Sequence, residues 1–208
     1  MEEKKKKISK KQVIIIAITS IIIIVGVIGG KIYNENKYQK KLIETSIEML
    51  NLGADSEKIS NNFISLWDGK ISDNFTSNNW TREYMARWIG IDVNTFMNNT
   101  TPLEVLDKAH DFNDVLRCYK EYNTRMLIND GLIKRIEKAE LDIMELNNPP
   151  SKFSKSYDAL VKMYTNVSSY VSLATNPTGS LNSYKSDTNA LSKNIVSEYN
   201  IVKTQIPN

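Results

Sequence analysis

The sequence predicts an all-α protein in which an N-terminal transmembrane helix is followed by an elongated antiparallel helical bundle. An uncharged, isoleucine-rich run lies near the N-terminus. Beyond it, apolar residues recur three and four positions apart, which is typical of amphipathic helices. Turns containing proline or glycine separate these segments, and no strand-like alternation occurs. We expect a basic tail over residues 1–12, a transmembrane helix over 13–30 and a soluble helical-bundle domain over 31–208.

Residues 13–30 have the properties of a membrane span. They carry no charge, and their only polar side chains are Thr19 and Ser20. A helix of this length extends about 27 Å, close to the hydrocarbon thickness of a bilayer. Isoleucines cover every face, unlike the single stripe of a soluble amphipathic helix. The run exceeds the apolar core of a cleaved signal peptide, the alternative interpretation, so we expect a signal-anchor that contacts the lipid bilayer.

Charge indicates the orientation and excludes one class of partner. Six lysines precede the run, whereas four follow it within a dozen residues, at positions 31, 37, 40 and 41. This bias favours a single-pass protein of the cell membrane with a cytoplasmic N-terminus and an extracellular C-terminal domain. Two of the 24 acidic and six of the 27 basic residues precede the run, which leaves 22 acidic and 21 basic residues after it. Such a domain lacks the positive charge that nucleic-acid binding requires, so no nucleic-acid partner is expected.

The first half of the domain is predicted as three helices. A long helix is predicted over about 33–73, with an apolar stripe that only Gly53 interrupts, and is interpreted as a possible continuation of the membrane span. A polar stretch over 72–79 follows it. The spacing then predicts a helix over 80–97, which Gly90 weakens, and a turn over 98–102. The third helix carries six apolar residues on one face: Val105, Ala109, Phe112, Leu116, Tyr119 and Met126.

The second half is predicted from its turns. A bend at 129–131 separates the third helix from a helix over 132–146, which Pro149 and Pro150 terminate. Ser151 is the expected N-cap of a helix over 153–174. After a turn over 176–179, Ser180 is the expected cap of a last helix that stops at Pro207. Long helices joined by short turns are antiparallel neighbours in a bundle.

Several short stretches carry a resemblance. They include Asp111-Phe112-Asn113, Asn148-Pro149-Pro150 and the turn Asn176-Pro177-Thr178-Gly179-Ser180. Over roughly 60–208 the chain resembles a group of uncharacterised membrane-anchored or lipoprotein-like helical proteins of Gram-positive bacteria. The resemblance implies a location at the cell envelope and no particular activity. The chain departs from the lipid-anchored members because it has no lipobox cysteine.

The only histidine lies in a cluster of acidic residues. On a continuous helix, Asp107, His110 and Asp114 would stack at intervals of three and four, and such ligands suit zinc or manganese. The alternative, which we favour, is a solvated face of mixed charge that Lys108 and Arg117 neutralise. We therefore expect neither a metal site nor a cofactor.

No residue set predicts catalysis. Cys118, the only cysteine, lies eight residues from His110, about 12 Å along a helix, too far for a nucleophile–base pair. Its place beside the apolar stripe indicates a small buried thiol. Phosphate loops and hydrolase motifs are missing from the sequence. We do not expect an enzyme.

Aromatic residues concentrate in the least regular region. Exposed, they would form a partner surface, and buried, they would close one end of the bundle, which is the interpretation we favour. The residues are Trp67, Trp80, Tyr84, Trp88 and Phe96. We expect a protein-interaction or structural role at the cell envelope. One further hypothesis is self-association, in which the seams of 33–73 and 153–174 pair as coiled coils. Another is a ligand-binding or sensor bundle that works with a separate signalling partner.

Overall fold

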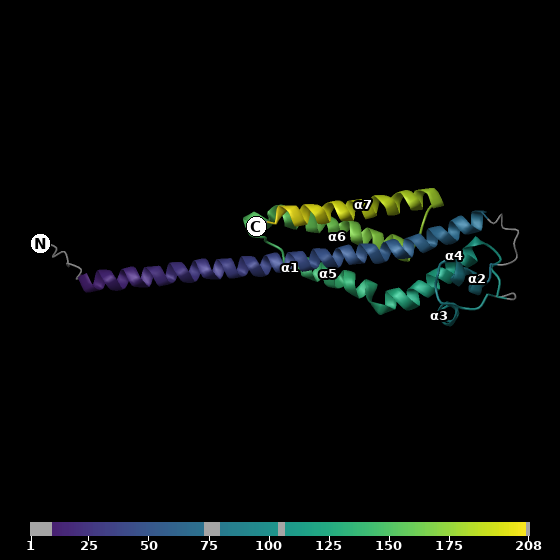
Figure 1. Ribbon diagram of the computed structural model, residues 1–208, viewed down its shortest axis with the longest axis horizontal. Helices are drawn as coiled ribbons and strands as arrows, with labels where there is room; N and C mark the ends of the chain where they lie inside the picture. The colour runs from purple at the N-terminus through teal and green to yellow at the C-terminus, as the bar shows by residue number, and fades with distance from the viewer. Residues whose placement is uncertain (1–9, 73–79, 104–106, 207–208) are drawn as a thin grey trace, which may run out of the picture.

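The predicted all-α class is confirmed. The computed structural model describes residues 10–72, 80–103 and 107–206, and for residues 10–33, 70–72, 112 and 127–130 it describes the backbone alone. Within these ranges the chain forms helices and no strand, apart from one isolated antiparallel bridge between Thr81 and Lys108. Figure 1 shows the other helices gathered along one part of a single long helix.

That long helix is α1 (Lys10–Ser72), and its backbone is continuous, as the sequence predicts. Its N-terminal part extends alone beyond the other helices (Figure 1). The predicted transmembrane segment, residues 13–30, is helical in its backbone, and its side chains lie outside the described residues. Residues 1–9 of the predicted basic tail and most of the polar stretch 72–79 lie outside them too. Among the side chains that the structure describes, no helix is long and apolar enough to cross a membrane.

Three consecutive helical segments, with a bend between them, run back along α1. They are α4 (Phe112–Asn123), the π-helical turns η1 (Thr124–Leu132) and α5 (Ile133–Glu145). The Tyr38 hydroxyl donates to the Leu146 carbonyl at 2.9 Å, whereas Arg135 reaches Asp55 at 2.6 Å. Because residue numbers rise on α1 as they fall on α5, the two helices are antiparallel. The bend predicted at 129–131 is confirmed, since Gly131 has a φ of 133°.

Two further helices complete the bundle. The helix α6 (Ser154–Thr175) runs in the direction of α1, because Lys152 pairs with Glu35 near its start and Tyr170 interacts with Ser60 farther along. The helix α7 (Leu181–Gln205) runs back, with Lys185 beside Asp68 and Ser192 beside Glu57. As predicted for neighbouring helices, α1 is therefore antiparallel to α5 and to α7, and α6 is antiparallel to α7.

The core consists of the predicted seams. The buried seam residues include Leu42, Met49, Leu52, Ile59, Phe63 and Leu66 of α1 and Leu160, Val167, Val171 and Ala174 of α6. These seams pack against each other and against α7 within one chain. Pairing between two chains through the same seams, as the self-association hypothesis requires, would open this core. The buried seams therefore do not support that version of the hypothesis, and self-association stays a prediction.

The helix caps match the prediction in one case and not in the other. Ser180 forms a capping box with Ser183 at the start of α7, as predicted. Ser151 makes no capping hydrogen bond, because a 3₁₀ turn, η2 (Ser151–Phe153), precedes α6. The Ser151 prediction is therefore wrong.

The region 80–111 differs most from the prediction. Instead of one helix it contains α2 (Arg82–Trp88) and α3 (Val93–Asn98), separated by Gly90 with a φ of 68°. The third predicted helix starts only at Phe112, so Ala109 precedes it, and Val105 lies outside the described residues. Side-chain caps explain the breaks, because Thr81, Asp92 and Asp111 each accept a hydrogen bond from the backbone N–H three residues later.

Candidate partner-binding surface

The α2–α3 segment caps the end of the bundle remote from the N-terminus (Figure 1). Arg82, only 6% exposed, holds it together. Its Nε donates to Asp107 at 2.6 Å, and its Nη1 donates to the carbonyls of Met97 and Thr100 at 3.1 and 2.9 Å. Burying a charge is costly unless it is paired and hydrogen-bonded, and this guanidinium meets both conditions. The cap is thus a built structure rather than a loose loop.

The five aromatic residues predicted as a partner surface have different environments. Trp80 and Phe96 are buried at 1% and 0% exposure, and Trp67 and Tyr84 are partly buried. Trp88 alone is well exposed, at 45%. Four of the five therefore help to close the bundle, which is the interpretation the sequence favours. Only Trp88 offers a large aromatic surface to solvent.

Trp88 is held in place despite its exposure. Its Nε1 donates to the Ser65 carbonyl of α1 at 3.0 Å, and its ring lies 5.9 Å from that of Trp80 and 5.8 Å from that of Tyr84. The ring sits directly over Gly69, where an added Cβ would approach it to 2.7 Å. A glycine within a helix is unfavourable by itself, and the close approach of this ring accounts for it.

Charged pairs flank Trp88. On α2, Arg87 donates to Glu83 at 2.7 Å. On the other side, Asp68, the neighbour of Gly69, pairs with Lys185 of α7 at 2.6 Å. All four side chains are at least one-third exposed. The surface thus has an aromatic centre and a charged rim.

The three metal-ligand candidates do not lie as they would on a continuous helix. Asp107 precedes α4 and pairs with Arg82, so it does not stack beneath His110 and Asp114, and the predicted helical spacing is wrong. Asp114 accepts from the backbone N–H of His110 at 2.9 Å and from Arg117 at 3.0 Å. Burial favours a higher pKa for Asp114, but these hydrogen bonds outweigh it and lower the pKa. Within the described residues, no group of three or more His, Cys, Asp or Glu side chains is arranged to hold a metal ion.

Cys118 is fully buried, as predicted. Burial raises the pKa of its thiol to about 11, since the thiolate would lose its hydration. The thiol is therefore protonated at neutral pH. A protonated, inaccessible thiol is a poor nucleophile.

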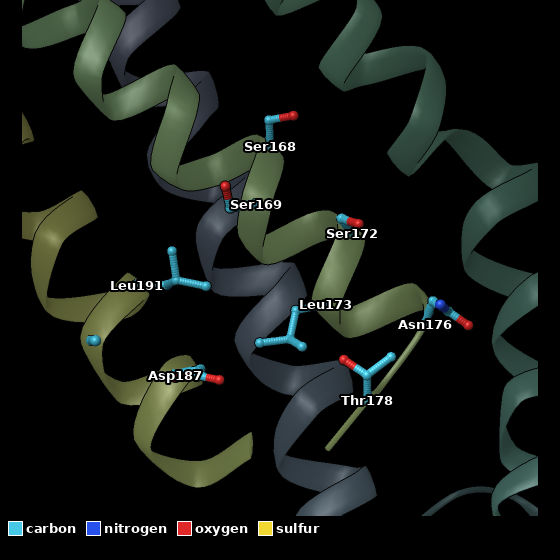
Figure 2. A pocket seen from close by; sticks show the side chains of 9 residues that line it. Ser168, Ser169, Ser172, Leu173, Asn176, Thr178, Asp187 and Leu191 are labelled. Atoms are coloured by element: carbon cyan, nitrogen blue, oxygen red, sulfur yellow. The ribbon is translucent and has the colours of Figure 1, made fainter. Parts of the chain in front are cut away.

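A polar groove that the sequence does not predict lies between α6 and α7. Figure 2 shows Leu173 and Leu191 between the two helices, with hydroxyl, amide and carboxylate groups around them. The cavity measures ≈ 680 Å³ and its polar lining consists of Ser168, Ser169, Ser172, Asn176, Thr178 and Asp187. Small polar residues on the outer side of a helix resemble an ordinary solvated face, so spacing alone gives no signal for the groove.

Comparison with known proteins yields no relative. No family model, no curated protein and no solved structure matches the chain.

Proposed function

We propose that this chain is a membrane-anchored, non-enzymatic helical-bundle protein that binds a protein partner through Trp88 on the outer side of the cell membrane. The observation that carries the proposal is that Trp88 is 45% exposed and yet fixed in position. Its indole N–H donates to the Ser65 carbonyl, and its ring packs on Gly69. Trp is enriched among residues that dominate binding energy at interfaces. A side chain already held in one rotamer loses little entropy on binding.

The anchor is supported by the composition of the N-terminal part of α1. Residues 13–30 contain nine isoleucines and no charge. This part of α1 extends beyond the helices that cover its remainder (Figure 1). Burying each large aliphatic side chain is worth about 1.5–3 kcal/mol, so moving these nine from water into lipid is favourable by roughly 15–25 kcal/mol. The six preceding lysines favour a cytoplasmic N-terminus.

The partner surface is tested by site-specific photo-crosslinking in cells. A photoreactive phenylalanine analogue at Arg87 lies beside Trp88, and the same group at Asn200 of α7, which is also exposed, is the control. We expect a crosslinked partner from position 87 only, and its loss when Trp88→Ala is added. Identical products from both positions, or a product that survives Trp88→Ala, would reject this surface. Trp80→Ala is unsuitable because Trp80 is buried.

Anchoring and orientation are tested with an introduced cysteine. Asn182→Cys places an exposed thiol on α7, whereas the native Cys118 is buried and gives little background. A membrane-impermeant maleimide should label the variant on intact cells, and the protein should sediment with membranes. Labelling only after permeabilisation contradicts the orientation. Recovery of the intact chain in the soluble fraction contradicts the anchor.

The α6–α7 groove favours a second candidate function, a ligand-binding or sensor bundle that works with a separate signalling partner. A cavity of ≈ 680 Å³ lies within the range of small-molecule sites, and its hydroxyl and amide lining suits a polar ligand. Ser172→Leu would place an apolar side chain in the polar lining of the groove. If the groove is the functional site, this variant fails to complement a deletion strain, whereas Trp88→Ala succeeds. The reverse result supports the partner surface.

A further inference from the structure

A small pocket lies on the outer face of α4 and the start of η1. It measures ≈ 230 Å³ and is lined by Arg117, Lys120, Glu121, Thr124 and Arg125. These positions are spaced at 0, 3, 4, 7 and 8 residues and therefore share one helical face. Three cationic side chains and one carboxylate line the pocket, and one of the cations, Arg117, also donates to Asp114 outside it at 3.0 Å.

The carboxylate of Glu121 is already engaged. Its Oε2 accepts the backbone N–H of Thr101 at 2.7 Å, and its Oε1 lies 3.8 Å from Arg117. These contacts turn Glu121 toward the loop that follows α3. Three cations against Glu121 and Asp114 still leave one net positive charge, and Lys120 and Arg125 pair with no carboxylate in the part of the chain that the structure describes.

The cations retain donors for a ligand. Lys120 donates one hydrogen bond to the Asn176 side chain at 2.7 Å, which fixes it against the turn between α6 and α7 and leaves two N–H groups. Arg125 is exposed and makes no hydrogen bond or ion pair with any part of the chain that the structure describes. The Thr124 hydroxyl donates to the Lys120 carbonyl at 2.8 Å, so it offers only an acceptor. The donors that converge on the pocket are therefore all charged.

We propose that this pocket binds a phosphate group, either as inorganic phosphate or as a phosphate ester. Arginine and lysine form strong charge-assisted hydrogen bonds with phosphate oxygens, and a tetrahedral oxyanion presents acceptors to donors from several directions. A carboxylate has two coplanar oxygens and one negative charge, so it matches three surrounding cations less well. The site is separate from Trp88 and does not depend on the proposed partner.

Equilibrium dialysis of the full chain in detergent micelles with radiolabelled inorganic phosphate tests the proposal. We expect one phosphate per chain. Arg125→Gln and Lys120→Gln should each weaken binding about tenfold, the effect of losing one hydrogen bond to a charged group. Lys193→Gln, which removes one exposed charge from α7, is the matched control and should change binding less than about twofold, because distant exposed charges are screened by salt.

Three outcomes would overturn the assignment. The first is the absence of stoichiometric phosphate binding, and the second is an Arg125→Gln variant that binds phosphate no more weakly than Lys193→Gln does. Acetate that competes as strongly as phosphate would assign the pocket to carboxylates instead. Glycerol 3-phosphate distinguishes the source, since stronger binding than that of inorganic phosphate indicates an ester. Because Arg125 is exposed and makes no hydrogen bond or ion pair with the described part of the chain, circular dichroism of Arg125→Gln should match that of the native protein.

Discussion

Replacing Gly69 by alanine sets two effects of similar size against each other. An alanine in a helix is more favourable than a glycine by about 1 kcal/mol. Its Cβ, however, would lie 2.7 Å from the Trp88 ring and would displace it. Trp88 is 45% exposed, so slightly more than half of its surface is covered, about 100 Å² of mostly apolar area, worth about 2.5 kcal/mol. Its hydrogen bond to Ser65 adds about 1 kcal/mol.

Displacement of Trp88 therefore outweighs the gain in helix propensity. If the ring keeps half of its contacts with Trp80 and Tyr84, we expect Gly69→Ala to destabilise the protein by about 1–2 kcal/mol. In a Trp88→Ala background the clash is absent, and the same substitution should stabilise the protein by about 1 kcal/mol. Urea unfolding of the full chain in detergent, followed by circular dichroism at 222 nm, measures all four members of this double-mutant cycle.

The sign of the effect tests the reasoning. Equal effects of Gly69→Ala in both backgrounds would mean that Trp88 does not rest on Gly69. A stabilising effect in both would mean that helix propensity alone governs the position. In cells, Gly69→Ala should also reduce crosslinking from position 87, because the displaced ring would no longer hold its bound orientation.

Three further predictions concern groups in the body of the bundle, each measured by urea unfolding. The pKa of Cys118 rises from an ordinary 9.0 to about 11 on burial, so the unfolded thiol ionises first and stability should fall between pH 9 and 11, with the fall reduced in Cys118→Ala. Burial favours a higher pKa for Asp142, but hydrogen bonds from Lys138 and Lys41 outweigh it and lower the pKa below the ordinary 3.8. Asp142 therefore contributes stability at neutral pH that is lost as the pH falls below 3.8. Asp142→Asn should cost about 1–2 kcal/mol at neutral pH and much less in acid. Ser180→Ala removes a capping box and should cost about 1 kcal/mol, whereas Ser197→Ala on the exposed face of α7 should not.

The long helices could be predicted because each has one buried side. Residues such as Leu42, Met49 and Ile59 on α1 and Leu160 and Val167 on α6 recur at helical spacing wherever the helix packs on its neighbours. The turns that precede α5, α6 and α7 contain proline or glycine, which are recognisable in the sequence. Element type, order and direction follow from these two signals.

The cap at the end of the bundle could not be predicted in the same way. Trp80, Tyr84 and Trp88 are spaced as on one helical face, but α2 begins only at Arg82. Trp80 therefore lies before the helix and is buried, whereas Trp88 at its end is exposed. The ion pair of Arg82 with Asp107 stabilises this cap and joins residues that are 25 positions apart. A contact over that distance produces no periodic pattern in the sequence. The phosphate pocket likewise depends on the contact of Lys120 with Asn176, which are 56 residues apart.

The helix that is proposed to enter the membrane is also the helix on which Trp88 rests. Ser65 and Gly69 belong to α1, which is continuous from Lys10. At about 1.5 Å per residue, the 39 residues from Gly30 to Gly69 place the Trp88 surface about 60 Å beyond the end of the proposed span if α1 stands upright. The partner must therefore reach this height. A crosslinked partner confined to the lipid surface would be incompatible with an upright α1, and would require either a strongly tilted bundle or a different binding surface.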